Sequence, residues 1–390
     1  MPKFPEFSGR TKSLTGSIFE KYHKQMMAQG SNLVRLHIGD SYLPPPYDIP
    51  IRQDFIQTHP GFNRYTNTFG IEALREVLSE KLQSENRLNV LAKNVMMTCG
   101  ACNALNISFQ SLIDPGEDVL LLTPCWPFFK GMIALAGGNA VEVPFYLELY
   151  QDPNLDIRTL LENYLTKKTS LLVLNTPNNP SGKVLNRKQL QQVAGFVKKH
   201  QLWLVSDEAY DGMTFDEHHH ISIGSFPGMF EQTISVFTFS KVYMFSGLRL
   251  GYAVAEEKVL RELNKISVHQ LYSPSTIGQE MMVEPVRTRQ RWSEAFVRHA
   301  RDLRNLFVRE LNISPQVPEG TYYFFFPITE YLNGREYWQV IDECLVNGVS
   351  VAPGKEFGAH YSEYVRICFT GEPPERLKLA IERLNRIFQT

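Results

Sequence analysis

Short apolar runs alternate with amphipathic segments through the middle of the chain. The runs are continuous rather than alternating, and they occupy residues 118–122, 170–174, 202–205, 233–237 and 248–254. Continuous apolar runs are typical of strands that are buried on both faces of a sheet. Because these runs alternate with helical segments, the pattern predicts an α/β domain with a mainly parallel sheet.

Between the runs, apolar residues recur at the spacing of a helix. Two stripes show this spacing: Ile71, Leu74, Leu78 and Leu82, and further along Leu190, Val193 and Val197. Asn186 and Gln189, three residues apart, match a capping box at the start of the second stripe. We therefore expect helices that flank the sheet.

The pattern of apolar and charged residues changes after about residue 285. A charged segment over residues 287–311 carries large apolar residues at helical spacing, which predicts one long helix. A turn, an aromatic run and a last helix are expected after it, over residues 318–320, 322–326 and 375–388. This part of the chain is typical of a second, smaller α+β domain.

The charges of the chain nearly cancel, with 40 Lys and Arg against 41 Asp and Glu and a formal net charge of −1. A chain without a charge excess exerts little long-range attraction on nucleic acids or anionic membranes. We therefore expect neither as a partner, and an anionic ligand would have to be bound by locally placed cations.

The sequence also lacks targeting and metal-binding patterns. No apolar signal segment is seen near the N-terminus, and the most apolar stretch, residues 119–136, is interrupted by two prolines and a lysine. The five cysteines are an odd number without a metal-type pairing. We expect a cytoplasmic protein with reduced, buried thiols and no metal site, in which His218–His220 form a solvated loop.

Polar signatures follow three of the predicted strands, namely Asn175–Gly182, Asp207–Tyr210 and Thr238–Lys241 with Arg249 eight residues further on. In an open α/β sheet, ligands bind beyond the carboxyl ends of the strands. Each signature alone has a plain structural explanation, as a turn, a helix cap or a solvated lysine. Their joint placement at strand ends indicates a single binding site.

Pyridoxal 5′-phosphate (PLP) requires the groups that these signatures supply. Lys241 offers the amine for a Schiff base, and Asp207 offers a carboxylate that keeps the pyridinium nitrogen protonated. Tyr210 and Asn179 can both reach the ring hydroxyl oxygen. The pattern therefore predicts a PLP site with Lys241, Asp207 and Tyr210 as its catalytic residues.

Further residues are candidates for the phosphate and the ring face. Thr238, Ser240 and Arg249 can hold the phosphate, since an arginine fork suits a tetrahedral anion. Gly100, Ala101 and Cys102 open a predicted helix whose N–H groups can approach the same phosphate. Trp126 follows another strand and can stack on the cofactor ring, with a plain core tryptophan as the alternative.

The whole set of motifs resembles the class I/II aminotransferases, the fold-type I PLP enzymes related to aspartate aminotransferase. The densest motifs of the resemblance are NTPNNPSG, SDEAYDG and SK with Arg249. The match as a whole spans nearly the entire chain, from Leu36–Gly39 near its start to Tyr364–Arg366 near its end. The resemblance implies a mainly parallel seven-stranded sheet flanked by helices. It also implies a large domain over residues 50–285 and a small domain built from residues 1–49 and 286–390.

The resemblance also assigns residues that the pattern alone does not. Arg366 is implied to bind the α-carboxylate of the substrate through two guanidinium N–H groups, with Gly39 and Asn179 beside it. Tyr65 is implied to reach the phosphate in the neighbouring subunit of a homodimer, and the Asn179–Pro180 peptide bond is expected to be cis. The expected partners are thus amino acid and 2-oxo acid substrates and a second copy of the chain.

The implied function is transfer of an amino group from an L-amino acid to a 2-oxo acid, with Lys241 as the general base and acid. Cys102 stands where some dicarboxylate-using relatives carry a lysine, and residues 268–276 offer no arginine, so a neutral donor is expected. Tyr42, Tyr47 and the run at 322–326 suit either an apolar or aromatic pocket or plain core packing. Elimination, cyclisation and racemisation on the same scaffold are the alternative reactions.

Overall fold

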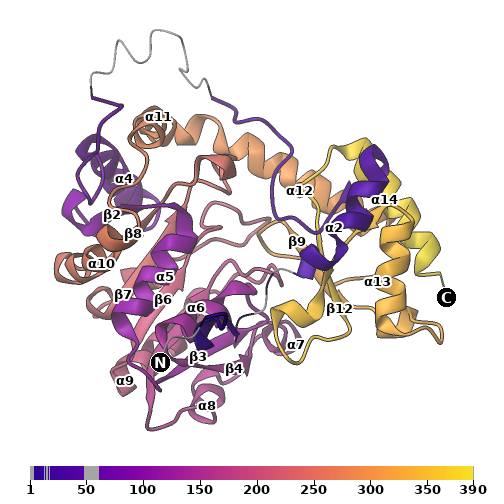
Figure 1. Cartoon of the computed structure of the whole chain (residues 1–390), viewed down its shortest axis with the longest axis horizontal. Coiled ribbons are helices and arrows are strands. Elements are labelled where there is room, and N and C mark those ends of the chain that lie inside the picture. The colour runs from indigo at the N-terminus through magenta and orange to yellow at the C-terminus, as the bar shows by residue number, and fades with distance from the viewer. Residues whose placement is uncertain (1–3, 13, 15, 17, 48–60, 390) are drawn as a thin grey trace.

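The computed structural model describes residues 4–12, 14, 16, 18–47 and 61–389. A seven-stranded sheet lies at its centre, with the strand order β2-β8-β7-β6-β5-β3-β4 (Figure 1). The strands are β2 (Val95–Thr98), β3 (Asp118–Thr123), β4 (Asn139–Pro144), β5 (Thr169–Asn175), β6 (Trp203–Asp207), β7 (Thr233–Thr238) and β8 (Gly251–Val254). Only the two pairings of β8, with β2 and with β7, are antiparallel. The predicted mainly parallel sheet is therefore confirmed.

Both faces of this sheet are apolar, as the continuous runs predicted. In β3, Val119 and Leu121 belong to one buried cluster, whereas Leu120 and Leu122 belong to another. Successive side chains of a strand point to opposite faces, so an unbroken apolar run serves two cores at once. The central strands are therefore covered on both sides by helices.

Helices of the first part of the chain precede the central sheet, separate several of its strands and follow its last strand. They are α1 (Gly9–Lys12), α2 (Ile18–Gln29), α4 (Glu72–Ser84), α5 (Gly100–Leu112), α6 (Phe128–Ala136), α7 (Glu148–Gln151), α8 (Ile157–Glu162), α9 (Arg187–His200), α10 (Glu257–Gln270) and α11 (Thr276–Arg287). The expected capping box is present at the start of α9, where Asn186 and Gln189 bond to each other's backbone N–H groups.

The C-terminal part forms two small sheets with three helices. In this part lie β9 (Tyr323–Pro327), β10 (Val349–Ser350), β11 (Ala352–Pro353), β12 (Tyr364–Cys368), α12 (Ser293–Glu310), α13 (Tyr337–Val346) and α14 (Pro374–Ile387). One sheet has the order β11-β12-β9, and the other pairs β10 with β1 (Val34–Arg35) from the N-terminal part. Figure 1 shows α2 beside α13, and β1 contacts α14, so N-terminal and C-terminal segments share this region.

Two elements differ from the sequence-based expectation. The strand expected at residues 248–254 begins only at Gly251, because Arg249 has a positive φ of 53° and cannot extend a strand. The single helix expected over residues 287–311 is interrupted before α12. There the chain turns inward, since the buried Arg289 pairs with Glu85 and the Trp292 indole N–H donates to the Pro285 carbonyl.

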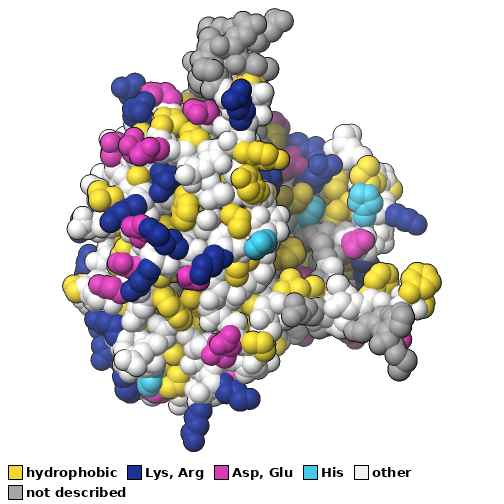
Figure 2. Space-filling model, turned by 60° about the vertical axis from the view of Figure 1, so that its left-hand side comes forward, with side chains coloured by type: hydrophobic (Ala, Val, Ile, Leu, Met, Phe, Trp, Pro, Cys, Tyr) yellow, Lys and Arg dark blue, Asp and Glu magenta, His cyan; other side chains and the backbone are white. Residues whose placement is uncertain are grey.

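The surface carries interspersed charges. On the face shown in Figure 2, basic and acidic side chains alternate over the part that holds the central sheet, as the near balance of charges would suggest. Within the described part of the chain, no helix is both long enough and apolar enough to span a membrane.

Candidate active site

A cavity of about 250 Å³ lies at the carboxyl ends of β5, β6 and β7. Parallel strands bring these ends to one edge, where Asn175 of β5 pairs with Asp207 of β6. The lining residues are Gly39, Ala101, Cys102, Leu105, Trp126, Asn179, Asp207, Ala209, Tyr210, Thr238, Ser240, Lys241, Ser246, Arg249, Tyr323 and Arg366. The cavity therefore unites all the site residues expected from the sequence except Gly100 and Tyr65, and Gly100 directly precedes the lining residue Ala101.

Asp207 is the one carboxylate that lines the cavity among the described residues. It is only 6% exposed, and its Oδ1 accepts a hydrogen bond from the Ala209 N–H at 3.1 Å. Burial raises the pKa of this carboxyl group to about 7, with the neighbouring Glu208 adding to the shift. Asp207 is thus a buried acid whose ionised form calls for a positive partner.

Lys241 follows β7 and directs its ammonium group into the same cavity. Its Nζ donates to the Gly39 carbonyl at 2.6 Å and lies 5.4 Å from the centre of the Tyr210 ring. Gly39 has no room for a side chain, because a Cβ there would lie 1.7 Å from the Tyr323 hydroxyl oxygen. The glycine therefore lets the N-terminal segment close the cavity against Lys241.

Two tyrosine hydroxyl groups meet deep in the cavity. The hydroxyl groups of Tyr210 and Tyr323 lie 2.6 Å apart, and both residues are nearly inaccessible to solvent. Burial raises the pKa of Tyr210 well above its ordinary value, and the Tyr323 hydroxyl adds to that effect. Tyr210 is therefore held in its neutral form, as a hydrogen-bond donor or acceptor.

Arg366, on β12, brings a guanidinium group to the opposite wall. Nη1 donates to Asn179 Oδ1 at 3.0 Å, and Nη2 donates to the His37 carbonyl at 2.6 Å. The guanidinium also lies over the Tyr323 ring, 4.2 Å from its centre. Its buried Nε has no hydrogen-bond partner among the described residues, which leaves a donor able to serve an anion.

A second group of hydrogen-bond donors lies where α5 begins. Gly100 has a positive φ of 76°, and a Cβ there would meet Arg249 Nη2 at 3.0 Å. The Thr238 hydroxyl donates to Ser240 Oγ at 3.0 Å, and both residues line the cavity. The N-terminus of a 13-residue helix, two hydroxyl groups and an arginine thus converge on one spot.

The remaining expected residues lie at the rim or outside the cavity. Trp126 is partly buried and packs edge-on against Phe129, with ring centres 5.6 Å apart. Cys102 is exposed, contrary to the expectation of buried thiols. Tyr65 is 83% exposed and contacts Tyr272, with ring centres 5.0 Å apart.

The structure decides several further expectations. For Tyr42 and Tyr47 it favours core packing over a pocket: neither lines the cavity, and their hydroxyl groups bond to His299 Nε2 and to the Tyr243 carbonyl. His220 was expected in a solvated loop, but its side chain is 5% exposed and bonds to the buried Glu208 at 2.7 Å. The Asn179–Pro180 peptide bond is cis, as expected.

Sequence reasoning missed four lining residues: Leu105, Ala209, Ser246 and Tyr323. Tyr323 belongs to the aromatic run at 322–326, whose alternation indicates two faces but not which face meets the cavity. Ser246 donates to Asp40 Oδ2 at 3.0 Å, and this contact between residues 206 positions apart has no signal in the sequence.

Comparison with known proteins identifies the family. The family model described as aminotransferase class I and II matches residues 32–384. The chain is 32% identical over 336 residues to an aspartate aminotransferase of Pyrococcus abyssi, covering 84% of this chain and 85% of that one. It is also 32% identical over 378 residues to aromatic-amino-acid aminotransferase 2 of Thermococcus litoralis, covering 93% and 94% of the two chains.

Solved structures agree with the sequence comparison. The aspartate aminotransferase from Thermus thermophilus with maleate superposes with a TM-score of 0.87 at 29% identity, covering 98% of this chain and 99% of that one. The fold is thus that of fold-type I enzymes, with the cavity at the expected sheet edge. The chain therefore belongs to the class I and II aminotransferase family and is a PLP-dependent enzyme.

Proposed function

We propose that the enzyme transfers the amino group of a neutral L-amino acid, apolar or aromatic, to a 2-oxo acid. The proposed class of amino donor rests on the charged groups that line the cavity. Among the described lining residues, the cations are Lys241, Arg249 and Arg366. Each of the three has a function that does not depend on the donor side chain.

The cavity residues fit PLP as the cofactor. The corner formed by Gly100, Thr238, Ser240 and Arg249 suits the phosphate, because a dianion there meets N–H groups, hydroxyl groups and a guanidinium. Asp207 is a buried carboxylate without an ion pair among the described residues, and a pyridinium nitrogen would supply the missing positive charge. When bound, PLP supplies an electron sink for the bonds at the substrate Cα.

Lys241 is proposed to hold the cofactor covalently through Nζ and, once released, to move the proton at the substrate Cα. Its Nζ is the primary amine that points into the cavity, close to the Tyr210 ring. Tyr210 and Asn179 are proposed to bond to the ring hydroxyl oxygen, with Trp126 on the ring face. Because Tyr210 is deeply buried and neutral, it can donate this bond.

Arg366 is proposed to bind the α-carboxylate, with Gly39 and Asn179 completing that wall. A carboxylate suits the unpartnered Nε and the adjacent Nη of a guanidinium that the Asn179 and His37 oxygens already orient. This leaves no free cation among the described lining residues for a second carboxylate. An unpaired carboxylate in a closed pocket costs several kcal/mol, so a dicarboxylate donor is disfavoured.

The relatives' names do not decide between donors, since one is named for aspartate and another for aromatic amino acids. We expect kcat/KM for phenylalanine or methionine to exceed that for aspartate by about tenfold or more, equivalent to about 1.4 kcal/mol. The measurement is steady-state kinetics of the unmodified enzyme with one fixed 2-oxo acid. A clear preference for aspartate would contradict the proposal.

Two variants separate the α-carboxylate from the side-chain pocket. Arg366→Ala should lower kcat/KM for every donor by about 10²-fold or more, because all donors share the α-carboxylate. Cys102→Lys places a cation on the cavity wall and should raise activity toward aspartate while leaving phenylalanine little changed. Product analysis without an oxo acid tests the elimination alternative, because elimination would continue without an acceptor. Transamination would stop after one half-reaction, with one oxo acid released per site.

A pH dependence follows for the cofactor-free protein. Burial raises the pKa of Asp207 from about 3.9 when unfolded to about 7 when folded. The folded state then holds the proton more tightly, so the stability from this group is complete below pH 4 and lost as the pH rises to about 7. Chemical denaturation from pH 4 to 7 should show this loss in the unmodified protein, and Asp207→Asn should remove it.

We infer a cytoplasmic homodimer in which Tyr65 reaches the phosphate of the neighbouring site, because its ring is exposed and does not line the cavity of its own chain. The division into a large domain over residues 50–285 and a small domain over residues 1–49 and 286–390 suits the separate sheets.

A further inference from the structure

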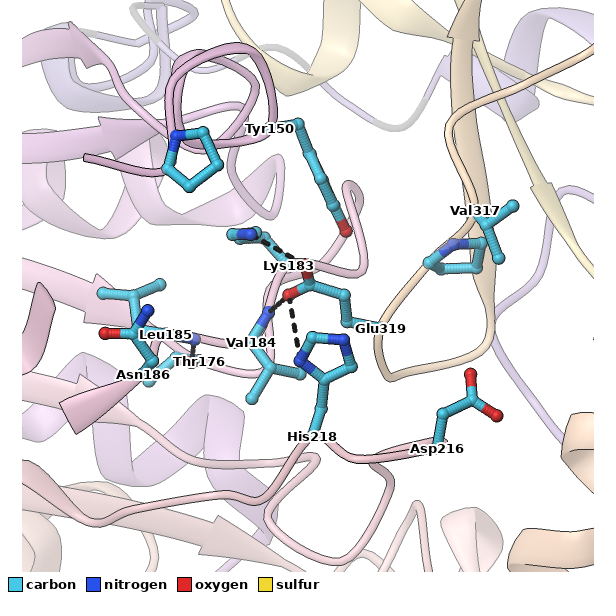
Figure 3. A network of polar contacts seen from close by, with 12 residues as sticks. Tyr150, Thr176, Lys183, Val184, Leu185, Asn186, Asp216, His218, Val317 and Glu319 are labelled. Carbon is cyan, nitrogen blue, oxygen red and sulfur yellow. Dashed lines mark hydrogen bonds and ion pairs between the residues drawn. The ribbon is translucent and has the colours of Figure 1, made fainter. Parts of the chain in front are cut away.

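An ion pair outside the cavity joins two segments that each carry a cavity residue. Glu319 lies in the turn before β9, and Lys183 lies in the loop after β5. Lys183 Nζ donates to Glu319 Oε1 at 2.7 Å, and the Val184 N–H donates to Oε2 at 2.9 Å (Figure 3). His218 Nδ1 lies 3.8 Å from Oε2 and is the third group at this carboxylate.

The two segments also touch through their backbones. The Gly182 carbonyl accepts hydrogen bonds from the N–H groups of Glu319 and Gly320, at 3.1 and 2.9 Å. Gly182 has a positive φ of 73°, and a Cβ there would lie 2.3 Å from Pro318 Cβ, so only glycine permits this approach. The Glu319 carboxylate extends the contact by two residues, to Lys183 and Val184.

The pair is buried, which argues against stability as its main contribution. The side chains of Lys183 and Glu319 are 8% and 13% exposed, and Lys183 Nζ lies 4.4 Å from the centre of the Tyr150 ring. The cost of removing two charges from water offsets most of their attraction, so such a pair adds little net stability. What it does provide is a fixed geometry between the elements that it joins.

Those elements hold both sides of Arg366. Asn179, four residues before Lys183, accepts a hydrogen bond from Arg366 Nη1. Tyr323, four residues after Glu319, provides the ring beneath the same guanidinium and the hydroxyl that meets Tyr210. A change in the spacing of the two segments would therefore alter two contacts of the Arg366 guanidinium: its hydrogen bond to Asn179 and its packing on the Tyr323 ring.

We propose that the Lys183–Glu319 ion pair is a positioning device that sets the distance between the Asn179 loop and β9, and thereby the orientation of Arg366 toward the substrate carboxylate. The proposal rests on the proposed function of Arg366. Neither Lys183 nor Glu319 lines the cavity, so both act through Asn179 and Tyr323 rather than by contact with the substrate.

The test compares Glu319→Gln, Lys183→Met and the double variant as holoenzymes. We measure KM and kcat for phenylalanine, the dissociation constant of the unreactive carboxylate 3-phenylpropionate, and the melting temperature. Both single variants should raise KM and the dissociation constant about tenfold, with kcat within about threefold of the original. If Glu319→Gln does not fold, Lys183→Met alone tests the proposal.

The double variant separates positioning from stability. It contains no unpaired buried charge, so its melting temperature should return toward that of the unmodified enzyme, while KM and the dissociation constant stay high. Recovery of KM together with the melting temperature, or an unchanged KM in both single variants, would overturn the proposal. An unmodified enzyme that does not transaminate neutral donors would instead refute the proposed function.

Glu162 provides a matched control, because its carboxylate also meets one lysine and one histidine. Lys199 Nζ and His200 Nε2 lie 2.6 and 2.8 Å from its Oε1, but the cluster is on the surface, away from the cavity. Glu162→Gln should leave KM, kcat and the dissociation constant unchanged. An effect as large as that of Glu319→Gln would show that the kinetics respond to any lost ion pair, which also overturns the proposal.

Discussion

Lys241→Ala should give a folded protein that binds PLP without a covalent bond and loses turnover by about four orders of magnitude or more. The variant lacks both the amine that holds the cofactor and the group proposed to move the proton at the substrate Cα. The cavity should otherwise persist, because among the described residues the Lys241 side chain makes a single hydrogen bond, to the Gly39 carbonyl, and no ion pair. Single-turnover kinetics and retention of the cofactor on a sizing column measure the two effects.

Borohydride reduction of the unmodified enzyme followed by peptide mass mapping identifies the modified lysine directly. The label is expected on Lys241, whereas Lys183, which is committed to Glu319, should stay unlabelled. Lys265→Ala is the control for loss of a lysine as such, since its side chain is 70% exposed on α10. A label on another lysine would refute the assignment of the whole cavity.

Asp207→Asn should retain covalent binding of PLP but slow the proton transfer by about 10²–10³-fold, or about 3–4 kcal/mol. The amide keeps the shape of the carboxyl group and loses the negative charge that stabilises a protonated ring nitrogen. No other carboxylate lines the cavity in the described part of the chain. The deuterium isotope effect on kcat should increase as the proton transfer becomes more strongly rate-limiting.

Asp207→Glu serves as the companion variant, because it preserves the charge and displaces it by one methylene group. It should be more active than Asp207→Asn if charge is decisive. Turnover of the Asn variant close to that of the original enzyme would mean that another acid serves the ring nitrogen.

The amino-acid sequence already predicted the central architecture. Runs such as residues 118–122 and 170–174 were recognisable as strands because both faces of each strand are buried, which leaves the run apolar throughout. The start of α9 was equally readable, since Asn186 and Gln189 cap a helix through contacts only three residues apart. Signals of this kind are local, so they can be recognised in the sequence without knowledge of the fold.

The joint position of Asp207 and Lys241 was predictable for a related reason. Asp207 ends one buried strand and Lys241 follows the next, and the ends of parallel strands meet at one edge of the sheet. Strand order was therefore not needed to expect these residues in one site. Arg366 was different, because from the residues alone it was one arginine among many and only the resemblance to a family distinguished it.

Only the tertiary structure decided the contacts between distant segments. The closure of Gly39 over Tyr323 and the meeting of Tyr210 with Tyr323 depend on how the small sheets pack on the large one. The burial of His220 against Glu208, twelve positions earlier, depends on how the loop after β6 folds back on the end of that strand. The sequence by itself determined the strands, the helices and the residues at the strand ends, because backbone geometry and burial impose local patterns. The identity of the cavity walls and of the Lys183–Glu319 pair emerged only in three dimensions, because a contact across 136 positions has no periodicity to reveal it.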